Sequence, residues 1–138
     1  MAADPEIVAL RAKLASRPRS DDYRQRRRDM DARGRDYGLP PDVTVEPVTA
    51  NGVRAEWTAT PGAAGDAAIL YLHGGGYVIG SLDSHRHLVA EAGRAADCRA
   101  LALDYGLAPE RTPSRLVGEG TSLSAVAKAG SVSARGSA

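Results

Sequence analysis

Hydrophobic and polar positions at the start of this chain recur at helical spacing. The pair Asp4–Pro5 is typical of a helix start, with an N-cap residue and proline at the first helical position. The apolar face that follows consists of Ile7, Leu10 and Leu14. A second helix is predicted over residues 21–36, capped by Asp21 and with a thin apolar stripe. Helices with so little apolar surface must pack on another part of the molecule.

The pattern changes to alternation after Asp42. Strands are predicted over residues 43–48 and 53–57, and Asn51–Gly52 between them supplies the turn of a β-hairpin. The run Ala67–Leu72 is apolar at every position, which is typical of a parallel strand buried on both faces.

A helix and a further strand complete the regular part of the chain. The helix is predicted to begin at Asp83 or Ser84 and to end near Ala96, and the strand covers residues 99–104. The apolar face of this helix is taken to be Leu88, Ala92 and Ala95. The order of three strands, one helix and one strand predicts a mixed sheet with a right-handed crossover, and therefore an α/β fold.

Composition narrows the classes of function. At about 100–200 residues per domain, 138 residues make one domain, and a net charge of +1 argues against a strongly electrostatic nucleic-acid binder. We interpret Arg26–Arg27–Arg28 as a solvated helix face. The single cysteine, Cys98, excludes an internal disulfide and is expected to be a small buried residue. No apolar run is long enough to span a membrane, and residues 1–10 lack a signal-peptide pattern, so we expect a cytoplasmic protein.

Three consecutive glycines, Gly74–Gly76, follow the apolar strand and indicate a backbone-mediated function. One candidate is an oxyanion hole, in which main-chain N–H groups face a developing negative charge. The alternative is a nucleotide-binding module of Rossmann type, with Asp104 as the ribose-binding acid. The spacing G-x-G-x-x-x-G and the bulky residues 77–79 disfavour this alternative.

The residues around the glycines resemble a known family. His73–Tyr77, Gly80–Ser81 and Asp104–Glu110 are together similar to the hormone-sensitive-lipase-like (bacterial family IV) esterase group of the α/β-hydrolase superfamily. The resemblance implies an incomplete α/β-hydrolase fold, with cap helices in residues 1–40 and a partial core in residues 41–110. It also implies that the exposed edge of the sheet lies at the strand Ala67–Leu72 and favours self-association.

The resemblance also assigns roles to individual residues. Gly75 and Gly76 would donate their N–H groups to the tetrahedral intermediate formed from an acyl ester substrate. The residues that would support this loop are His73, Gly74, Tyr77, Asp104 and Glu110. Gly106 departs from the family, which usually has arginine there. We expect no cofactor and no metal, because His85 and His87 do not share a helix face and no carboxylate is placed to complete a site with His73.

The sequence contains no catalytic triad of the family. No G-x-S-x-G string occurs, Ser122 lies in the nearest approximation to it, and no histidine follows His87. Residues 111–138 do not match the family and are expected to be disordered or weakly helical. We therefore expect a truncated N-terminal portion that is inactive alone. The competing hypothesis is a non-catalytic fragment that associates with a partner chain.

Overall fold

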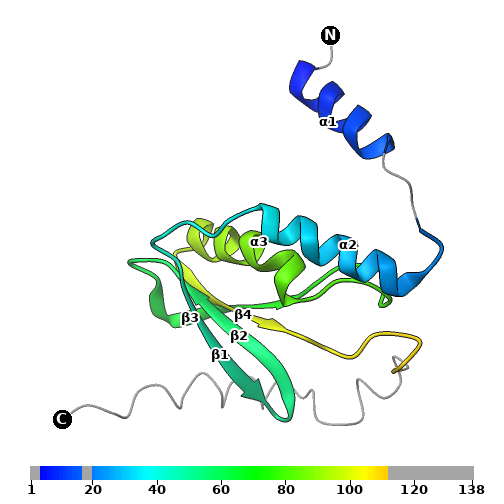
Figure 1. The fold of residues 1–138 in the computed structure, drawn as a ribbon. Helices are drawn as coiled ribbons and strands as arrows, with labels where there is room; N and C mark the ends of the chain where they lie inside the picture. Colours follow the sequence, from blue (N-terminus) through cyan, green and yellow to red (C-terminus); the bar gives the residue numbers. More distant parts are fainter. Residues whose placement is uncertain (1–3, 17–19, 112–138) are drawn as a thin grey trace.

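The described part of the computed structural model, residues 4–16 and 20–111, contains helices on one side of a mixed β-sheet (Figure 1). In chain order the elements are α1 (Pro5–Ala15), α2 (Tyr23–Asp36), β1 (Thr44–Ala50), β2 (Val53–Ala59), β3 (Ala64–Leu72), α3 (Leu82–Ala95) and β4 (Cys98–Leu103). The strand order is β1-β2-β4-β3, with β3 and β4 parallel and the other neighbours antiparallel. This confirms the predicted incomplete α/β-hydrolase architecture. The expected tail falls almost entirely outside the described residues.

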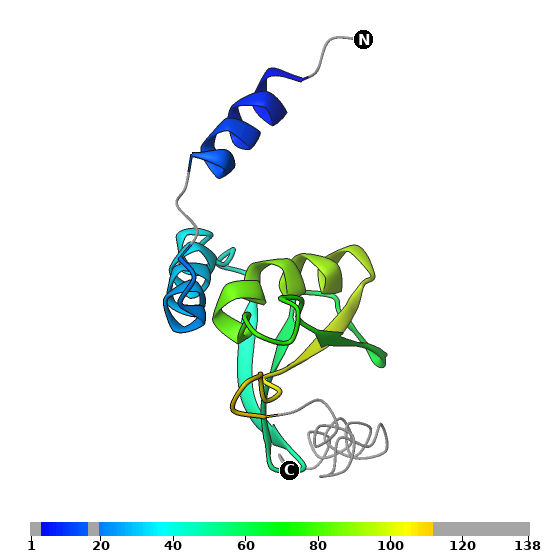
Figure 2. The same ribbon diagram turned by 90° about the vertical axis from the view of Figure 1, so that its right-hand side faces the viewer.

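Alternate side chains of β4 build two separate apolar clusters on the two faces of the sheet. Ala100 and Ala102 pack with Leu82 and Val89 of α3, and helix α3 crosses this face of the sheet in Figure 2. Leu101 and Leu103 belong to a second cluster. The other buried members of that second cluster are Ala50, Ala55 and Trp57. Because β4 is central and buried on both faces, its sequence is almost continuously apolar, as predicted.

Helix α3 begins earlier than the sequence suggested. Its N-cap is Ser81, not Asp83 or Ser84, because Ser81 and Ser84 cap each other's backbone N–H groups in a capping box. The predicted apolar face was also wrong: Leu88 is 54% exposed, whereas the neighbouring Val89 and Ala90 are buried. Contact with β4 therefore selects a face rotated by one residue from the predicted one.

The β-hairpin forms as predicted, and β3 is longer than predicted. Asn51 and Gly52 both have positive φ, 49° and 81°, as the tight turn between β1 and β2 requires. Strand β3 begins at Ala64 instead of Ala67, with a register irregularity between Ala64 and Ala68. Among the described strands β3 pairs only with β4, so the expected sheet edge is at β3. Burial on both faces was predicted for Ala67–Leu72 and was wrong: Ala67, Ala68 and Leu72 are exposed, and residues 69–71 are only partly buried.

The two N-terminal helices differ in their packing. Helix α1 buries no residue and stands apart from the sheet in Figures 1 and 2. Helix α2 is capped by Asp22, one residue after the predicted Asp21, and packs beside α3. Gly34 makes this contact close, since a Cβ there would lie 2.3 Å from the Asp83 carbonyl oxygen. The expectation that these helices pack on another element is confirmed for α2 and was wrong for α1.

Candidate functional site

The chain turns sharply between β3 and α3, at residues 73–80, through a backbone that only glycine adopts readily. Positive φ occurs at Gly75 (130°), Gly76 (63°) and Gly80 (105°), and also at Tyr77 (58°). At Gly75 a Cβ would lie 2.0 Å from the Ile79 carbonyl oxygen, so both space and conformation require glycine there. The turn therefore presents main chain, with few side chains, at the carboxyl end of β3.

The N–H groups of Gly75 and Gly76 donate to no acceptor among the described residues. The Gly75 carbonyl oxygen, in contrast, accepts two hydrogen bonds, from the N–H groups of Val78 (3.2 Å) and Ile79 (3.1 Å). Since a peptide unit is planar and trans, fixing this carbonyl also fixes the Gly76 N–H, which points the opposite way. The turn thus keeps main-chain donors available and oriented, as an oxyanion hole requires.

His73 lies beneath the turn and is only 4% exposed. Its Nδ1 is 3.0 Å from the Gly74 carbonyl oxygen, and its ring stacks on Tyr105 with ring centroids 4.3 Å apart. The Tyr105 hydroxyl donates to the His73 carbonyl oxygen, and a Cβ on Gly80 would collide with the His73 ring. His73 is therefore a packed support of the turn, and its Nε2 has no hydrogen-bond partner among the described residues.

A second histidine, His85, stacks against His73 with ring centroids 5.4 Å apart. Burial, followed by the nearby His73, lowers the pKa of His85 below its ordinary value of 6.5. The Ser84 hydroxyl lies 2.8 Å from His85 Nδ1, but it also accepts from the Ser81 N–H in the capping box. This hydroxyl therefore serves the start of α3, and the serine–histidine contact has a structural explanation. Groups of three or more metal-ligating side chains are absent from the described ranges.

The two predicted acidic supports pair with arginines of other elements. Asp104, at the end of β4, accepts from Arg54 of β2 at 2.8 Å. Glu110 accepts from Arg27 of α2 through both carboxylate oxygens, at 3.0 and 2.9 Å. The Asp104 carboxylate needed for the nucleotide-binding alternative is thus already engaged. Tyr77 is 58% exposed at the apex of the turn, and Gly74 has open space around it.

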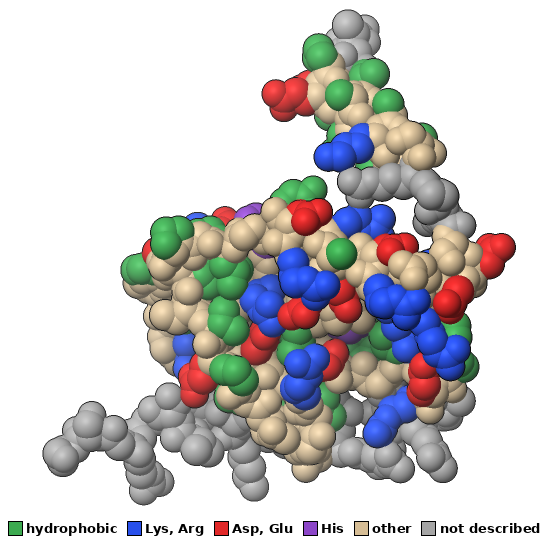
Figure 3. All heavy atoms as spheres, viewed as in Figure 1, with side chains coloured by type: hydrophobic (Ala, Val, Ile, Leu, Met, Phe, Trp, Pro, Cys, Tyr) green, Lys and Arg blue, Asp and Glu red, His purple; other side chains and the backbone are tan. Residues whose placement is uncertain are grey.

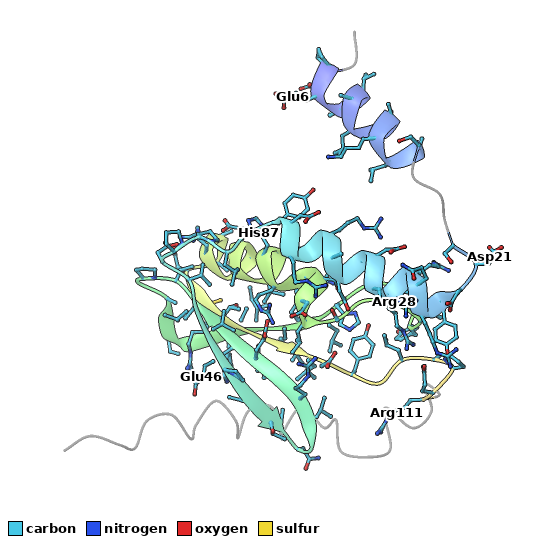
Figure 4. All side chains as sticks on the ribbon, viewed as in Figure 1. Glu6, Asp21, Arg28, Glu46, His87 and Arg111 are labelled. Atoms are coloured by element: carbon cyan, nitrogen blue, oxygen red, sulfur yellow. The ribbon has the colours of Figure 1, made fainter. Side chains whose placement is uncertain are left out.

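Gly106, where the family usually has arginine, is covered by another arginine. A Cβ on Gly106 would lie 2.2 Å from Cδ of Arg111, so the Arg111 stem occupies the space beside the backbone. Figure 4 marks Arg111 at the end of the described chain. The sequence did not indicate this contact, because the two residues are close in space but five positions apart in the chain.

Arg27 is a functional candidate that the sequence did not indicate. It was interpreted as part of a solvated face, yet its side chain is only 24% exposed and reaches the turn after β3. That interpretation was wrong for Arg27. Figure 3 shows positive and negative side chains intermixed on the visible face of the molecule. The partners of Arg27 lie 51 to 83 residues away, so no local pattern reveals them.

Comparison with known proteins finds similarity to α/β-hydrolases and to enzymes that cleave esters. A family model described as "alpha/beta hydrolase fold" matches residues 69–127, which extends beyond Glu110. An acetyl-hydrolase of Streptomyces hygroscopicus is 44% identical over 73 residues, covering 53% of this chain and 23% of the relative. An ethyl acetate hydrolase of Pseudomonas putida is 54% identical over 44 residues, covering 32% of this chain and 14% of the relative. The chain thus spans less than a quarter of either relative.

Solved structures extend the similarity to most of the chain. An esterase from the bacterial hormone-sensitive lipase family is 41% identical, with a TM-score of 0.77, and the match covers 86% of this chain and 41% of that one. A hormone-sensitive lipase from a metagenome library gives a TM-score of 0.79 at 28% identity, covering 93% of this chain and 44% of the other. Over most of its described length the chain is similar to the N-terminal part of bacterial esterases of the hormone-sensitive lipase family, and its fold is that of an incomplete α/β-hydrolase.

Proposed function

We propose that this chain supplies the oxyanion-stabilising part of a carboxylic ester hydrolase. The observation that carries the proposal is the glycine turn after β3, in which the N–H groups of Gly75 and Gly76 have no acceptor among the described residues. Each such donor lowers the barrier of acyl transfer by about 3–4 kcal/mol when it meets the charged intermediate. The names of the relatives, acetyl-hydrolase and ethyl acetate hydrolase, favour a short acyl ester as substrate.

The chemistry needs groups that this sequence does not contain. A serine nucleophile on a G-x-S-x-G turn, an acid and a histidine base are required, and none can be assembled here. We therefore propose that the 138-residue chain does not turn over esters alone. Its donors act only when a segment carrying the nucleophile, acid and base completes the sheet.

A chimera tests this function. Residues 20–111 would replace the corresponding part of the 41%-identical esterase, which supplies the remaining residues. The chimera should hydrolyse p-nitrophenyl acetate, whereas the 138-residue chain alone and a chimera with the nucleophilic serine changed to alanine should not. A chimera that folds, by circular dichroism, but shows no hydrolysis would contradict the proposal.

We also propose self-association through β3 and a cytoplasmic location without a nucleic-acid partner. No described strand pairs with the outer side of β3, and an open strand edge favours pairing with a second copy. The single buried Cys98 suits a reducing compartment, and a net charge of +1 is not that of a strongly basic nucleic-acid binder. In the described ranges, every helix is too short or too polar to cross a lipid bilayer. Cell fractionation and a nucleic-acid mobility-shift assay test the last two proposals.

A further inference from the structure

The Arg27 side chain connects α2 to two segments that are distant in sequence. Its Nε donates to the Val78 carbonyl oxygen at 2.7 Å, and its Nη2 donates to the Ala108 carbonyl oxygen at 2.8 Å. Val78 belongs to the glycine turn, and Ala108 belongs to the segment after β4. The same two segments touch directly, since the Ala108 N–H donates to the Tyr77 carbonyl oxygen at 2.8 Å. Arg27 therefore closes a three-way junction beside the turn.

The guanidinium is held in place by two further residues. Glu110 accepts from both Nη1 and Nη2 of Arg27, in the bidentate geometry that suits a guanidinium and a carboxylate. The Tyr23 ring lies under the guanidinium, 4.9 Å from Cζ, and the Tyr23 hydroxyl donates to Glu110 at 3.2 Å. These hydrogen bonds, that from Arg27 first, lower the pKa of Glu110 to about 2, so the carboxylate is charged at neutral pH.

The junction connects to the oxyanion donors through a short chain of hydrogen bonds. Arg27 fixes the carbonyl of Val78, and the N–H groups of Val78 and Ile79 fix the carbonyl of Gly75. That carbonyl shares a rigid peptide plane with the Gly76 N–H. A change in the Arg27 contact would therefore rotate or loosen the plane that carries one of the two donors.

We propose that Arg27 is a positioning residue for the oxyanion donors, so that α2 supports the acyl-oxygen site from outside it. The inference rests on the proposed function for the role of these donors. Arg27 does not touch the reacting atoms, and it acts through Val78. Two other arginines of α2 have different contacts: Arg28 donates to Gln25 within the helix, and Arg35 pairs with Asp83 in an exposed position. Figure 4 marks Arg28 on α2, where it provides a matched control.

Amide hydrogen exchange of the 138-residue chain tests the proposal without any ester turnover. Arg27→Lys keeps the positive charge but cannot reach both carbonyls and the carboxylate together. Losing one charge-assisted hydrogen bond should speed exchange about tenfold at the amides of Val78, Ile79 and Ala108. The Leu101 amide at the centre of the sheet should exchange at an unchanged rate. Arg28→Lys should change none of the four.

Each other outcome decides the question. Unchanged exchange at Val78 and Ile79 in Arg27→Lys overturns the proposal, as does complete lack of protection at these amides in the natural chain. Equal acceleration at Leu101 indicates a general structural role and also overturns it. If Arg27→Lys does not fold, Glu110→Gln replaces it, since it leaves the two carbonyl bonds possible and should speed exchange at Val78 and Ala108 less than tenfold but measurably. An inactive ester-hydrolase chimera would leave these rates unaffected, so the two proposals fail separately.

Discussion

At the scale of single residues, the turn after β3 depends on positions where a side chain has neither space nor a suitable backbone. Gly75 and Gly80 combine positive φ with close neighbours, whereas Gly62 has positive φ and open space. Substitutions at these three positions therefore distinguish the cost of an unfavourable backbone conformation from the cost of a steric collision. His85 has a lowered pKa, because burial and the nearby His73 both favour its neutral form.

Gly80→Ala should destabilise the fold by about 3 kcal/mol, at the upper end of ordinary point mutations. Its Cβ would lie 2.3 Å from Nδ1 of His73 and 2.5 Å from the Gly74 carbonyl oxygen, at a φ of 105°. Gly62→Ala, at a φ of 85° with no neighbour within 4 Å, should cost about 1 kcal/mol. Urea unfolding measures both. Equal losses of unfolding free energy in Gly80→Ala and Gly62→Ala would contradict this prediction, because they would mean that the collision with His73 adds no cost.

Lowering the pH should destabilise the fold through His85. Its pKa is lower in the folded chain than in the unfolded one, so the unfolded chain binds more protons just below the ordinary value of 6.5. The stability is fully present above that value and is lost as pH falls toward the folded pKa. The melting temperature should fall between about pH 7 and pH 5, and less in His85→Asn. His87→Asn should keep the full fall, and an equal reduction in both variants would contradict the assignment.

At the scale of elements, a buried ion pair joins α3 to β2. The Glu56 side chain, on the α3 face of the sheet, is 5% exposed and accepts from Nε and Nη2 of Arg86 at 2.8 and 2.9 Å. Arg86 also contacts Asp83 on its own helix. Because the Glu56 carboxylate is out of water, its only strong compensation among the described residues is this arginine. The pair therefore sets where α3 lies on the sheet, next to the turn.

Arg86→Gln should destabilise the chain by about 3 kcal/mol, since it leaves the buried Glu56 carboxylate without its cation. Arg94→Gln is the control, because Arg94 pairs with Asp42 and Glu91 in exposed positions of the same helix and should change stability much less. Chemical denaturation gives both values. A loss at Arg94 equal to that at Arg86 would show that burial of Glu56 does not dominate.

The sequence predicted the elements better than their limits. The hairpin followed from Asn51–Gly52, and β4 from its apolar run. The start of α3 was missed because Ser81, Asp83 and Ser84 can all cap a helix. The hydrogen bonds between Ser81 and Ser84 select Ser81 as the N-cap. Its buried face was missed because small apolar residues occur on several faces of this helix. Contact with the sheet determines which of these faces is buried.

The candidate site was predicted in part. The glycine turn was located correctly, because a triple glycine after an apolar strand is a local signal, while the catalytic roles of its residues stay predictions. The contacts of Asp104 and Glu110 with Arg54 and Arg27 depend on pairs far apart in sequence. The covering of Gly106 by Arg111 is a contact between side chain and backbone that no single-position pattern shows.

At the scale of the whole molecule, the two edges of the sheet differ in protection. Edge strand β1 contains Pro47 and Glu46, and both residue types discourage pairing with another chain. Edge strand β3 has Asp66 and a register irregularity near its start, but residues 69–72 carry no charge and no proline, and Leu72 at the end of the strand is 59% exposed. In the described part of the chain, the second half of β3 is therefore the less protected stretch of sheet edge.

Leu72→Lys should reduce concentration-dependent self-association, because a charge at the edge must lose water when a second strand pairs there. Leu88→Lys is the matched control, since Leu88 is 54% exposed on α3 and away from the edge. Sedimentation velocity over a range of protein concentrations distinguishes them. If Leu88→Lys reduces association as much as Leu72→Lys, apolar surface in general, and not the β3 edge, drives it.

The position of Trp57 gives this chain an internal optical reporter. Trp57 is the sole tryptophan of the sequence, it lies on β2 opposite Leu101 of β4, and the Arg99 guanidinium from β4 sits 4.6 Å from its ring centroid. Indole emission depends on such a nearby cation and on shielding from solvent. Fluorescence excited at tryptophan therefore follows the contact between β2 and β4 and is insensitive to events in α1, which carries no indole.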